Sequence, residues 1–274
     1  MNLMYIDWTL DPVMFSIAGF EFRYYTFMWI LAFWAGTLFF NSFTKREGIS
    51  QEANEAIFIY TILGAMLGAR IGHCLFYEPE TYLVRPWEII TKIRNGGLAS
   101  HGAAIGMIIG LWLWSRKYKI AMVWALDRIM IPVGLGGALV RFGNLFNSEI
   151  FGYPTTLPWG FKFHRSMLWM RESGGMAVHP TQIYEAIIYL ITFGVLALMY
   201  YKWDLARRRP ALLFGVGMQG IFLSRILVES IKYSQVGFEQ GMSLNMGQWL
   251  SVPFVLLGAG FIWYSLSREE VKVK

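Results

Sequence analysis

The sequence predicts an all-α polytopic membrane protein with seven transmembrane helices. Of its 274 residues, 55% are hydrophobic and 17% aromatic, and the mean hydropathy is +0.42. This composition is too apolar for an ordinary soluble domain of similar length. Apolar stretches recur along the chain, and basic residues gather in alternate short gaps between them. We therefore expect a single integral membrane domain over residues 1–274, with an external loop at about 150–181.

Each predicted helix has about the 20 mainly apolar residues that cross a hydrocarbon core roughly 30 Å thick. In chain order, the predicted helices span residues 25–43, 56–76, 98–114, 124–145, 183–201, 211–231 and 249–266. The fifth follows Pro180, which suits the first position of a helix, and the sixth follows Pro210. The connections between the seven helices are short except for two.

Glycines at four-residue spacing predict that the second and third helices pack closely. They are Gly64, Gly68 and Gly72 in the second helix, and Gly102, Gly106 and Gly110 in the third. Such spacing makes a flat helix face that lets two backbones approach in a membrane. The single cysteine, Cys74, excludes an internal disulfide and a cysteine metal cluster, and we interpret it as a small packed residue.

The distribution of Lys and Arg predicts the orientation. The gaps 44–47, 115–120, 202–209 and 268–274 hold twelve basic residues, whereas the alternate gaps hold seven and the first 22 residues none. Since cytoplasmic loops carry the basic excess, we expect the N-terminus outside and the C-terminus in the cytoplasm. The formal net charge of +6 therefore belongs to the membrane borders and does not indicate nucleic-acid binding. Because the N-terminus lacks the basic start of a cleavable signal peptide, we expect no removal.

Polar side chains from all seven helices are predicted to meet in one layer in the outer half of the bundle. At about 1.5 Å of rise per residue, Arg141 and Asn144 lie about 25 to 30 Å from the cytoplasmic end of their helix. The other helices contribute to this layer Tyr24, Tyr25, Arg70, His73, Tyr77, His101, His179, Gln182, Arg225, Glu229 and Gln248. A charged side chain deep in a bilayer is unfavourable in free energy and usually has a function. A long charged side chain near the interface can instead extend its head group into water at little free-energy cost. For each residue taken alone, the functional and the interfacial interpretation both stay open. The presence of the whole set in one layer favours a functional interpretation.

Two groups in this layer carry specific alternatives. Arg225 and Glu229 are four residues apart and share a helix face, so they either neutralise each other or hold a ligand. Arg141, Asn144 and Ser148 share a face if the fourth helix extends that far, and Glu149 is predicted to begin the loop. His179 is as plausible a cap or packing residue as a ligand.

Arginines at an outer leaflet suit a lipid phosphate, because the guanidinium is a planar donor fork and two of them can compensate the charge of a leaving phosphate. The sequence shows no HExxH, no Gly-x-Ser-x-Gly and no paired acidic metal site. We expect transfer chemistry without a metal or cofactor. An anionic-lipid binding or transport protein without chemistry is the alternative, although its polar residues would then have to continue through the inner half. An intramembrane protease is disfavoured, because no serine–histidine or aspartate pair stands at membrane depth.

The external loop carries aromatic and basic residues together. They are Trp159, Phe161, Phe163, Arg165, Trp169 and Arg171. Such a segment is typical of an amphipathic cover on the membrane surface, or of a gate or peptide platform.

Six stretches resemble the motifs of the prolipoprotein diacylglyceryl transferases, in the same order and over nearly the whole chain. They are "RIGHCLFY", "GGLASHGAAIG", "RFGNLFNSEIFGYPTTLPWG", "HPTQIYEA", "SRILVE" and "GQWLSVPF". The resemblance implies a multi-pass enzyme of the bacterial inner membrane with its active site toward the periplasm. Its implied reaction moves the diacylglyceryl group of phosphatidylglycerol onto the lipobox cysteine of a prolipoprotein signal peptide, forming a thioether and releasing glycerol 1-phosphate.

The resemblance also implies roles for matching residues, which are Tyr25, His101, Arg141, Asn144, Glu149, Arg225 and Glu229. We predict His101 as the base, Arg141 and Arg225 as the catalytic phosphate clamp, and the others, with Arg70 and Asn147, as substrate-binding residues. In these roles Asn144 and Glu149 fix the glycerol hydroxyls or orient an arginine, and Glu229 holds Arg225. The chain departs from the family pattern where glycine is usual, at Thr26, Ala103, Val140 and Ser148. It also has Lys232 near a position where the family usually has a second arginine.

Overall fold

The computed structural model describes residues 5–76, 78–91, 99–233 and 244–272. The chain divides into two compact units, one made of residues 1–39 and 126–274 and the other of residues 40–125. Long helices account for most of both units, and the chain is therefore an all-helical membrane protein in its main architecture.

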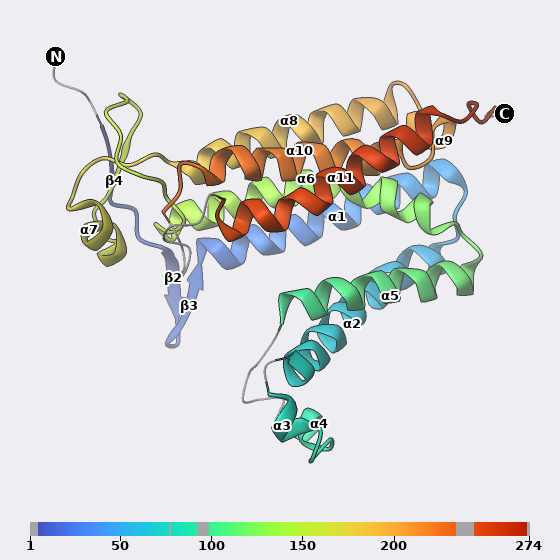
Figure 1. Cartoon of the computed structure of the whole chain (residues 1–274), viewed down its shortest axis with the longest axis horizontal. Coiled ribbons are helices and arrows are strands. Elements are labelled where there is room, and N and C mark those ends of the chain that lie inside the picture. Colours follow the sequence, from blue (N-terminus) through green and yellow to red (C-terminus); the bar gives the residue numbers. More distant parts are fainter. Residues whose placement is uncertain (1–4, 77, 92–98, 234–243, 273–274) are drawn as a thin grey trace. The chain divides into compact units, whose positions relative to one another are not determined.

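Long helices run side by side in the first unit (Figure 1). These are α1 (Tyr24–Glu47, through residue 39), α6 (Met122–Phe146, from residue 126), α8 (Thr181–Tyr201), α10 (Leu212–Glu229) and α11 (Met246–Leu266). Helix α10 packs against both α8 and α11. Small residues permit close approach, since a Cβ built on Gly215 of α10 would lie 2.8 Å from the Gly258 carbonyl oxygen of α11, and one on Gly137 of α6 would meet the Tyr189 ring of α8 at 3.0 Å.

Six described helices are long and apolar enough to cross a membrane: α1, α2 (Gln51–Phe76), α6, α8, α10 and α11. The third predicted span is present as α5 (Ser100–Tyr118), but this helix is not among the six. Its sequence contains three glycines and ends in Arg116 and Lys117, which lowers the hydropathy of any long window within it. A polytopic membrane protein is confirmed. A membrane span at α5, which would bring the number of spans to seven, stays a prediction.

Two helices begin three or more residues earlier than their apolar sequences predict. Helix α2 begins at Gln51 instead of residue 56, because its polar first turn forms helix outside the apolar stretch. Helix α11 begins at Met246 instead of residue 249, since Asn245 and Gln248 form a capping box with hydrogen bonds of 2.9 and 3.1 Å.

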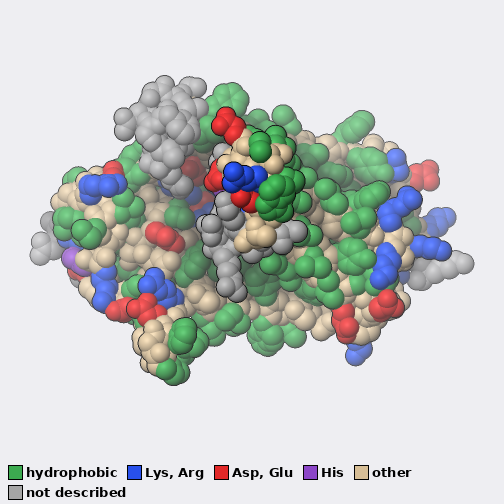
Figure 2. Space-filling model, turned by 90° about the horizontal axis from the view of Figure 1, so that it is seen from below, with side chains coloured by type: hydrophobic (Ala, Val, Ile, Leu, Met, Phe, Trp, Pro, Cys, Tyr) green, Lys and Arg blue, Asp and Glu red, His purple; other side chains and the backbone are tan. Residues whose placement is uncertain are grey.

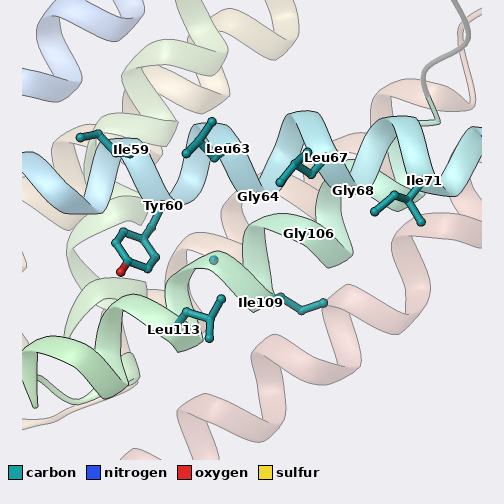
Figure 3. A pocket seen from close by; sticks show the side chains of 11 residues that line it. Ile59, Tyr60, Leu63, Gly64, Leu67, Gly68, Ile71, Gly106, Ile109 and Leu113 are labelled. Atoms are coloured by element: carbon teal, nitrogen blue, oxygen red, sulfur yellow. The ribbon is translucent and has the colours of Figure 1, made fainter. Parts of the chain in front are cut away.

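The second unit is built on α2 and α5, whose glycines face each other (Figure 3). A Cβ on Gly106 would overlap the carbonyl oxygen of Gly64, and one on Gly102 would overlap that of Gly68. The predicted close packing is confirmed, and Cys74 is buried in α2 as a free thiol. A groove of about 500 Å³ follows this seam and is lined by apolar side chains, among them Leu63, Leu67 and Ile109.

Short strands are present that the sequence analysis did not predict. Strand β1 (Ile6–Trp8) pairs in parallel with β4 (Phe161–Phe163), and β2 (Val13–Ile17) pairs antiparallel with β3 (Phe20–Arg23). The β2–β3 turn has Ala18 and Gly19 at φ 50° and 84°, the positive-φ pattern of tight hairpins. These strands are too short to give a clear alternating pattern in the sequence.

The external loop is folded around its own aromatic side chains. Phe161, Phe163 and Trp169 are at most 5% exposed and form a cluster with Phe151 and Val178. Helix α7 (Met167–Ser173) is capped by Ser166, and the Trp169 indole donates to the Met176 carbonyl at 2.8 Å. Of the four loop aromatics singled out in the sequence, Trp159 is the exposed one, at 50%. Most of the aromatic surface therefore stabilises the loop itself instead of facing a membrane.

Two buried charged residues of α6, Asp127 and Arg128, fix the start of α10 in the first unit; the contact of Asp127 with the start of α10 is called the Asp127 staple. The Asp127 carboxylate of α6 accepts hydrogen bonds from the backbone amides of Ala211 at 2.8 Å and Phe214 at 2.9 Å. Its neighbour Arg128 donates to the Ala206 carbonyl in α9 (Leu205–Arg208) at 3.2 Å. Both side chains are at most 2% exposed. Asp127 and Arg128 therefore have partners in the protein's own backbone. These contacts explain why two charged side chains are buried here, and no transport path is needed to explain them.

Large apolar side chains are exposed along the long helices, as lipid contact requires. Trp34 of α1, Leu67 of α2 and Leu256 of α11 are 61%, 61% and 67% exposed. Figure 2 shows hydrophobic side chains over much of the face in view. A soluble protein rarely exposes so much contiguous apolar surface.

Candidate active site

Arg141 is held by α8 and by its own helix. Its Nε lies 2.9 Å from Glu185 Oε2, and its Nη1 donates to Asn144 Oδ1 at 3.3 Å. The Glu185 side chain is fully buried, and that of Arg141 is 13% exposed. Both charged groups of this ion pair are therefore largely removed from water, where a missing partner would be costly.

Glu149 is fixed by the two asparagines that precede it. Its Oε1 accepts from Asn144 Nδ2 at 2.8 Å and from Asn147 Nδ2 at 3.2 Å. Gln182 of α8 donates to the Glu149 backbone carbonyl at 2.5 Å. Asn144 thus joins Arg141 to Glu149, as its position one helical turn after Arg141 allows.

The backbone around Glu149 is left-handed on both sides. Ser148 has φ 54° and Ile150 has φ 60°, a conformation that costs about 1–2 kcal/mol for residues with a Cβ. Thr181 of α8 secures this turn by donating to the Ile150 carbonyl at 2.6 Å. Ser148 is one of the positions where the resemblance implies glycine, and its positive φ gives a physical reason for that preference.

Ser148→Gly is expected to stabilise the protein by about 0.5–1 kcal/mol, because glycine adopts this φ without a Cβ clash. The midpoint of thermal unfolding in detergent measures this change. Ser148→Ala keeps the Cβ and serves as the control, for which no gain is expected. A Gly variant that melts below the Ala variant would show that the left-handed turn is not strained.

Glu229 is bound by Lys232 and not by Arg225, which corrects the predicted pairing within α10. Lys232 Nζ lies 3.2 Å from Glu229 Oε2 and 2.9 Å from Glu185 Oε1. The Nε of Arg225 is buried and has no hydrogen-bond partner among the described residues. The ammonium three residues after Glu229 bridges two buried carboxylates, those of Glu185 and Glu229, and so compensates both charges at once.

Tyr189 of α8 lies near the two arginines of the predicted clamp. Its side chain is within electrostatic range of Arg141, Arg225 and Glu185. The ring is 5% exposed and packs over Gly137. Helices α6, α8 and α10 thus bring both guanidiniums to one place in the first unit.

Helices α1 and α11 complete the surroundings of this cluster. The Tyr25 ring lies against Gly143, where a Cβ would approach it to 2.8 Å. Gly247 of α11 lies against the Glu229 carboxyl group in the same way, at 2.6 Å. Asn245 donates to the Glu229 carbonyl at 3.1 Å, so the start of α11 is fixed to the end of α10.

The remaining predicted site residues belong to the second unit. Arg70 is 4% exposed, and it donates to the Ile89 carbonyl at 3.0 Å and to the Tyr82 hydroxyl at 3.2 Å. It thereby holds the short helices α3 (Pro79–Tyr82) and α4 (Glu88–Thr91) beside α2. The backbone of His101 lies in the first turn of α5, and its side chain is outside the described part. Their substrate and base roles stay predictions.

His179 lies before α8 and contacts Tyr184, with 3.2 Å between Nδ1 and the hydroxyl. Partial burial lowers its pKa below the usual value. A neutral imidazole of this kind suits the packing role that the sequence left open beside a ligand role.

Glu185, Tyr189 and Lys232 are the site residues for which sequence reasoning assigned no role. Glu185 is the single acidic residue of the 183–201 stretch, and an ionisable residue inside a predicted span is itself a functional signal. Tyr189 follows one turn later on the same face. Lys232 departs from the family pattern, and one of its partners, Glu229, is three residues away, but the other, Glu185, lies 47 residues earlier in the chain.

The structure defines an integral membrane protein with a buried, charge-paired cluster at one end of a helix bundle. The sequence model of the prolipoprotein diacylglyceryl transferase family matches residues 12–264, and the chain belongs to this family.

Relatives named phosphatidylglycerol–prolipoprotein diacylglyceryl transferase cover nearly the full length. The Porphyromonas gingivalis protein is 43% identical over 94% of this chain and 93% of its own length. The Chloroherpeton thalassium protein is 40% identical over 98% and 97%, and a Bacteroides fragilis protein is 36% identical over 98% and 99%. The predicted family is confirmed, and the chain is a transferase.

Proposed function

We propose that the cluster around Arg141, Glu149 and Arg225 is where this chain transfers the diacylglyceryl group of phosphatidylglycerol to the lipobox cysteine of a secreted prolipoprotein. The observation that carries this assignment is that two arginines lie within electrostatic range of Tyr189, and that the buried Nε of one of them, Arg225, has no hydrogen-bond partner among the described residues. Such a group is suited to bind an oxyanion that arrives with the substrate.

The reaction forms one S–C bond and breaks one C–O bond. The cysteine sulfur attacks the glycerol carbon that carries the phosphodiester oxygen, and the electron pair of the breaking bond stays on the phosphate. The leaving group is glycerol 1-phosphate, whose phosphate gains negative charge. Arg141 and Arg225 stabilise that charge where it develops.

The thiol proton must be removed, because a thiol of pKa about 8.5 is mostly protonated at neutral pH. His101, in the first turn of α5, is the proposed base. Glu149, held by two asparagine amides, accepts hydrogen bonds from glycerol hydroxyls or orients an arginine. Tyr25, Arg70, Asn144 and Asn147 are the other proposed substrate-binding residues, and Glu229 acts through Lys232.

Incubation of the purified protein with labelled phosphatidylglycerol and a lipobox peptide tests this proposal. A thioether-linked diacylglyceryl peptide is the expected product, and a serine-for-cysteine peptide is the matched control. Lipid binding without this product would favour the alternative, an anionic-lipid binding or transport protein.

The proposed topology has seven spans, with the cluster facing the periplasm and the C-terminus in the cytoplasm. A reporter fused after Arg209 should therefore report a cytoplasmic location, and one fused near Arg171 an external location. The basic clusters at alternate ends of the helices are the reason. The opposite pattern would place the cluster away from secreted precursors and contradict the proposal.

A further inference from the structure

Lys232 occupies an unusual place for a lysine. Its side chain is 2% exposed, and its ammonium contacts Glu185 of α8 at 2.9 Å and Glu229 of α10 at 3.2 Å. Its backbone forms a bridge with Gly152, which lies in the segment just after Glu149. Lys232 thus joins two helices and the following loop at the cluster, although it lies outside the helices that carry the predicted clamp.

Both carboxylates that contact Lys232 have an arginine within reach. Glu185 already contacts Arg141 at 2.9 Å, and Glu229 lies one helical turn from Arg225. A buried carboxylate without a cationic partner is unfavourable in free energy. Without Lys232, the Glu185 and Glu229 carboxylates would therefore pair with the two arginines instead. The guanidiniums would then be occupied before any phosphate arrives.

The formal charges lead to the same conclusion. The cluster contains the cations Arg141, Arg225 and Lys232 and the carboxylates of Glu149, Glu185 and Glu229. These six groups balance when all are ionised. Without Lys232 they carry one net negative charge, which repels an anionic headgroup in a site of low dielectric.

We propose that Lys232 is a positioning residue that keeps Arg225 available for a lipid phosphate by neutralising Glu229 and Glu185. The inference rests on the proposed function, because it takes the phosphate as the ligand of Arg225. Lys232 itself does not contact the substrate in this proposal, and its effect passes through the two carboxylates.

Lys232→Met should raise KM for phosphatidylglycerol about tenfold or more, with a smaller change in kcat and in KM for the peptide. A tenfold change corresponds to about 1.4 kcal/mol, within the range of couplings between contacting charges. Lys232→Arg keeps the cation and should restore KM to within about threefold of the original. Equal loss in the Met and Arg variants would contradict a role based on charge.

A double variant separates an indirect role from direct lipid contact. In the Glu229→Gln background, Lys232→Met should change KM by less than about threefold, because the carboxylate that would occupy Arg225 is gone. A KM increase as large as in the original background would overturn the proposal, since Lys232 would then act on the lipid or on folding. If Lys232→Met alone fails to fold, recovery of folded, lipid-binding protein in the double variant supports the proposal, and failure to recover overturns it.

Direct binding distinguishes this inference from the proposed function. Labelled phosphatidylglycerol in detergent micelles should bind the original protein and Lys232→Arg more tightly than Lys232→Met, whether or not any thioether forms. Binding in this order without a thioether product would refute the transfer reaction and leave the inference intact. Equal binding by all three proteins would refute the inference alone.

Discussion

Arg141→Lys is expected to lower transfer activity about ten- to a hundredfold while the protein still inserts and folds. Lysine keeps the charge but has a single nitrogen, whereas Arg141 contacts Glu185 through Nε and Asn144 through Nη1, and its planar fork is the proposed phosphate contact. A charge-assisted, desolvated contact is worth about 1.5–3 kcal/mol, which sets the range of this loss. Arg141→Ala should lose more, because it also leaves buried Glu185 with one cation fewer.

The measurement is transferase activity at equal amounts of folded membrane protein. Lys45→Ala, at the opposite end of α1 from Tyr25, is the control and should be nearly neutral. Near-original turnover in both Arg141 variants would show that the arginine only reaches the interface, and Arg225 would then be the main phosphate contact.

Gly106→Ala should have the second large effect, through the packing of α2 and α5. Its Cβ would overlap the carbonyl oxygen of Gly64, a backbone atom that cannot rotate away, so the two helices must move apart. We expect a loss of about 1–3 kcal/mol of stability. Since α5 carries His101, a shift of about 1 Å could also lower activity about a hundredfold.

Gly194→Ala in α8 is the matched control, because a Cβ there meets nothing within 4 Å. The same substitution at an open position should be neutral or slightly stabilising in a helix. Thermal unfolding in detergent and transferase activity should be recorded for both variants. Unchanged values for Gly106→Ala would mean that the two helices do not need this close approach.

Much of the helical framework could be predicted from hydropathy alone, because lipid demands about 20 apolar residues wherever a helix crosses. The glycine faces of α2 and α5 were equally visible, since four-residue spacing of small side chains has one main structural use in membranes. The short strands and the fold of the external loop could not be predicted from the sequence. Phe163 and Trp169 look interfacial in sequence, and their burial depends on contacts with Phe151 and Val178 in three dimensions.

The contacts of the candidate site could likewise be predicted from the sequence only in part. Arg141, Asn144 and Glu149 lie close in sequence, and the structure brings them into contact. The partner of Glu229 was predicted wrongly, because the four-residue rule favours Arg225 and says nothing of a cation beyond the helix end. Glu185 lies 44 residues after Arg141, and no local rule connects them.

The Asp127 staple has a consequence for how the chain length can vary. Arg141 follows Asp127 by fourteen residues in α6, and Arg225 follows Ala211, which Asp127 contacts, by fourteen residues. Both arginines therefore stand about 21 Å beyond a common starting level, at 1.5 Å per residue. A one-residue insertion or deletion in either stretch would displace one arginine by about 1.5 Å and turn it by about 100° around its helix axis. The loops of this protein can therefore tolerate changes in length, whereas neither fourteen-residue interval is expected to tolerate one.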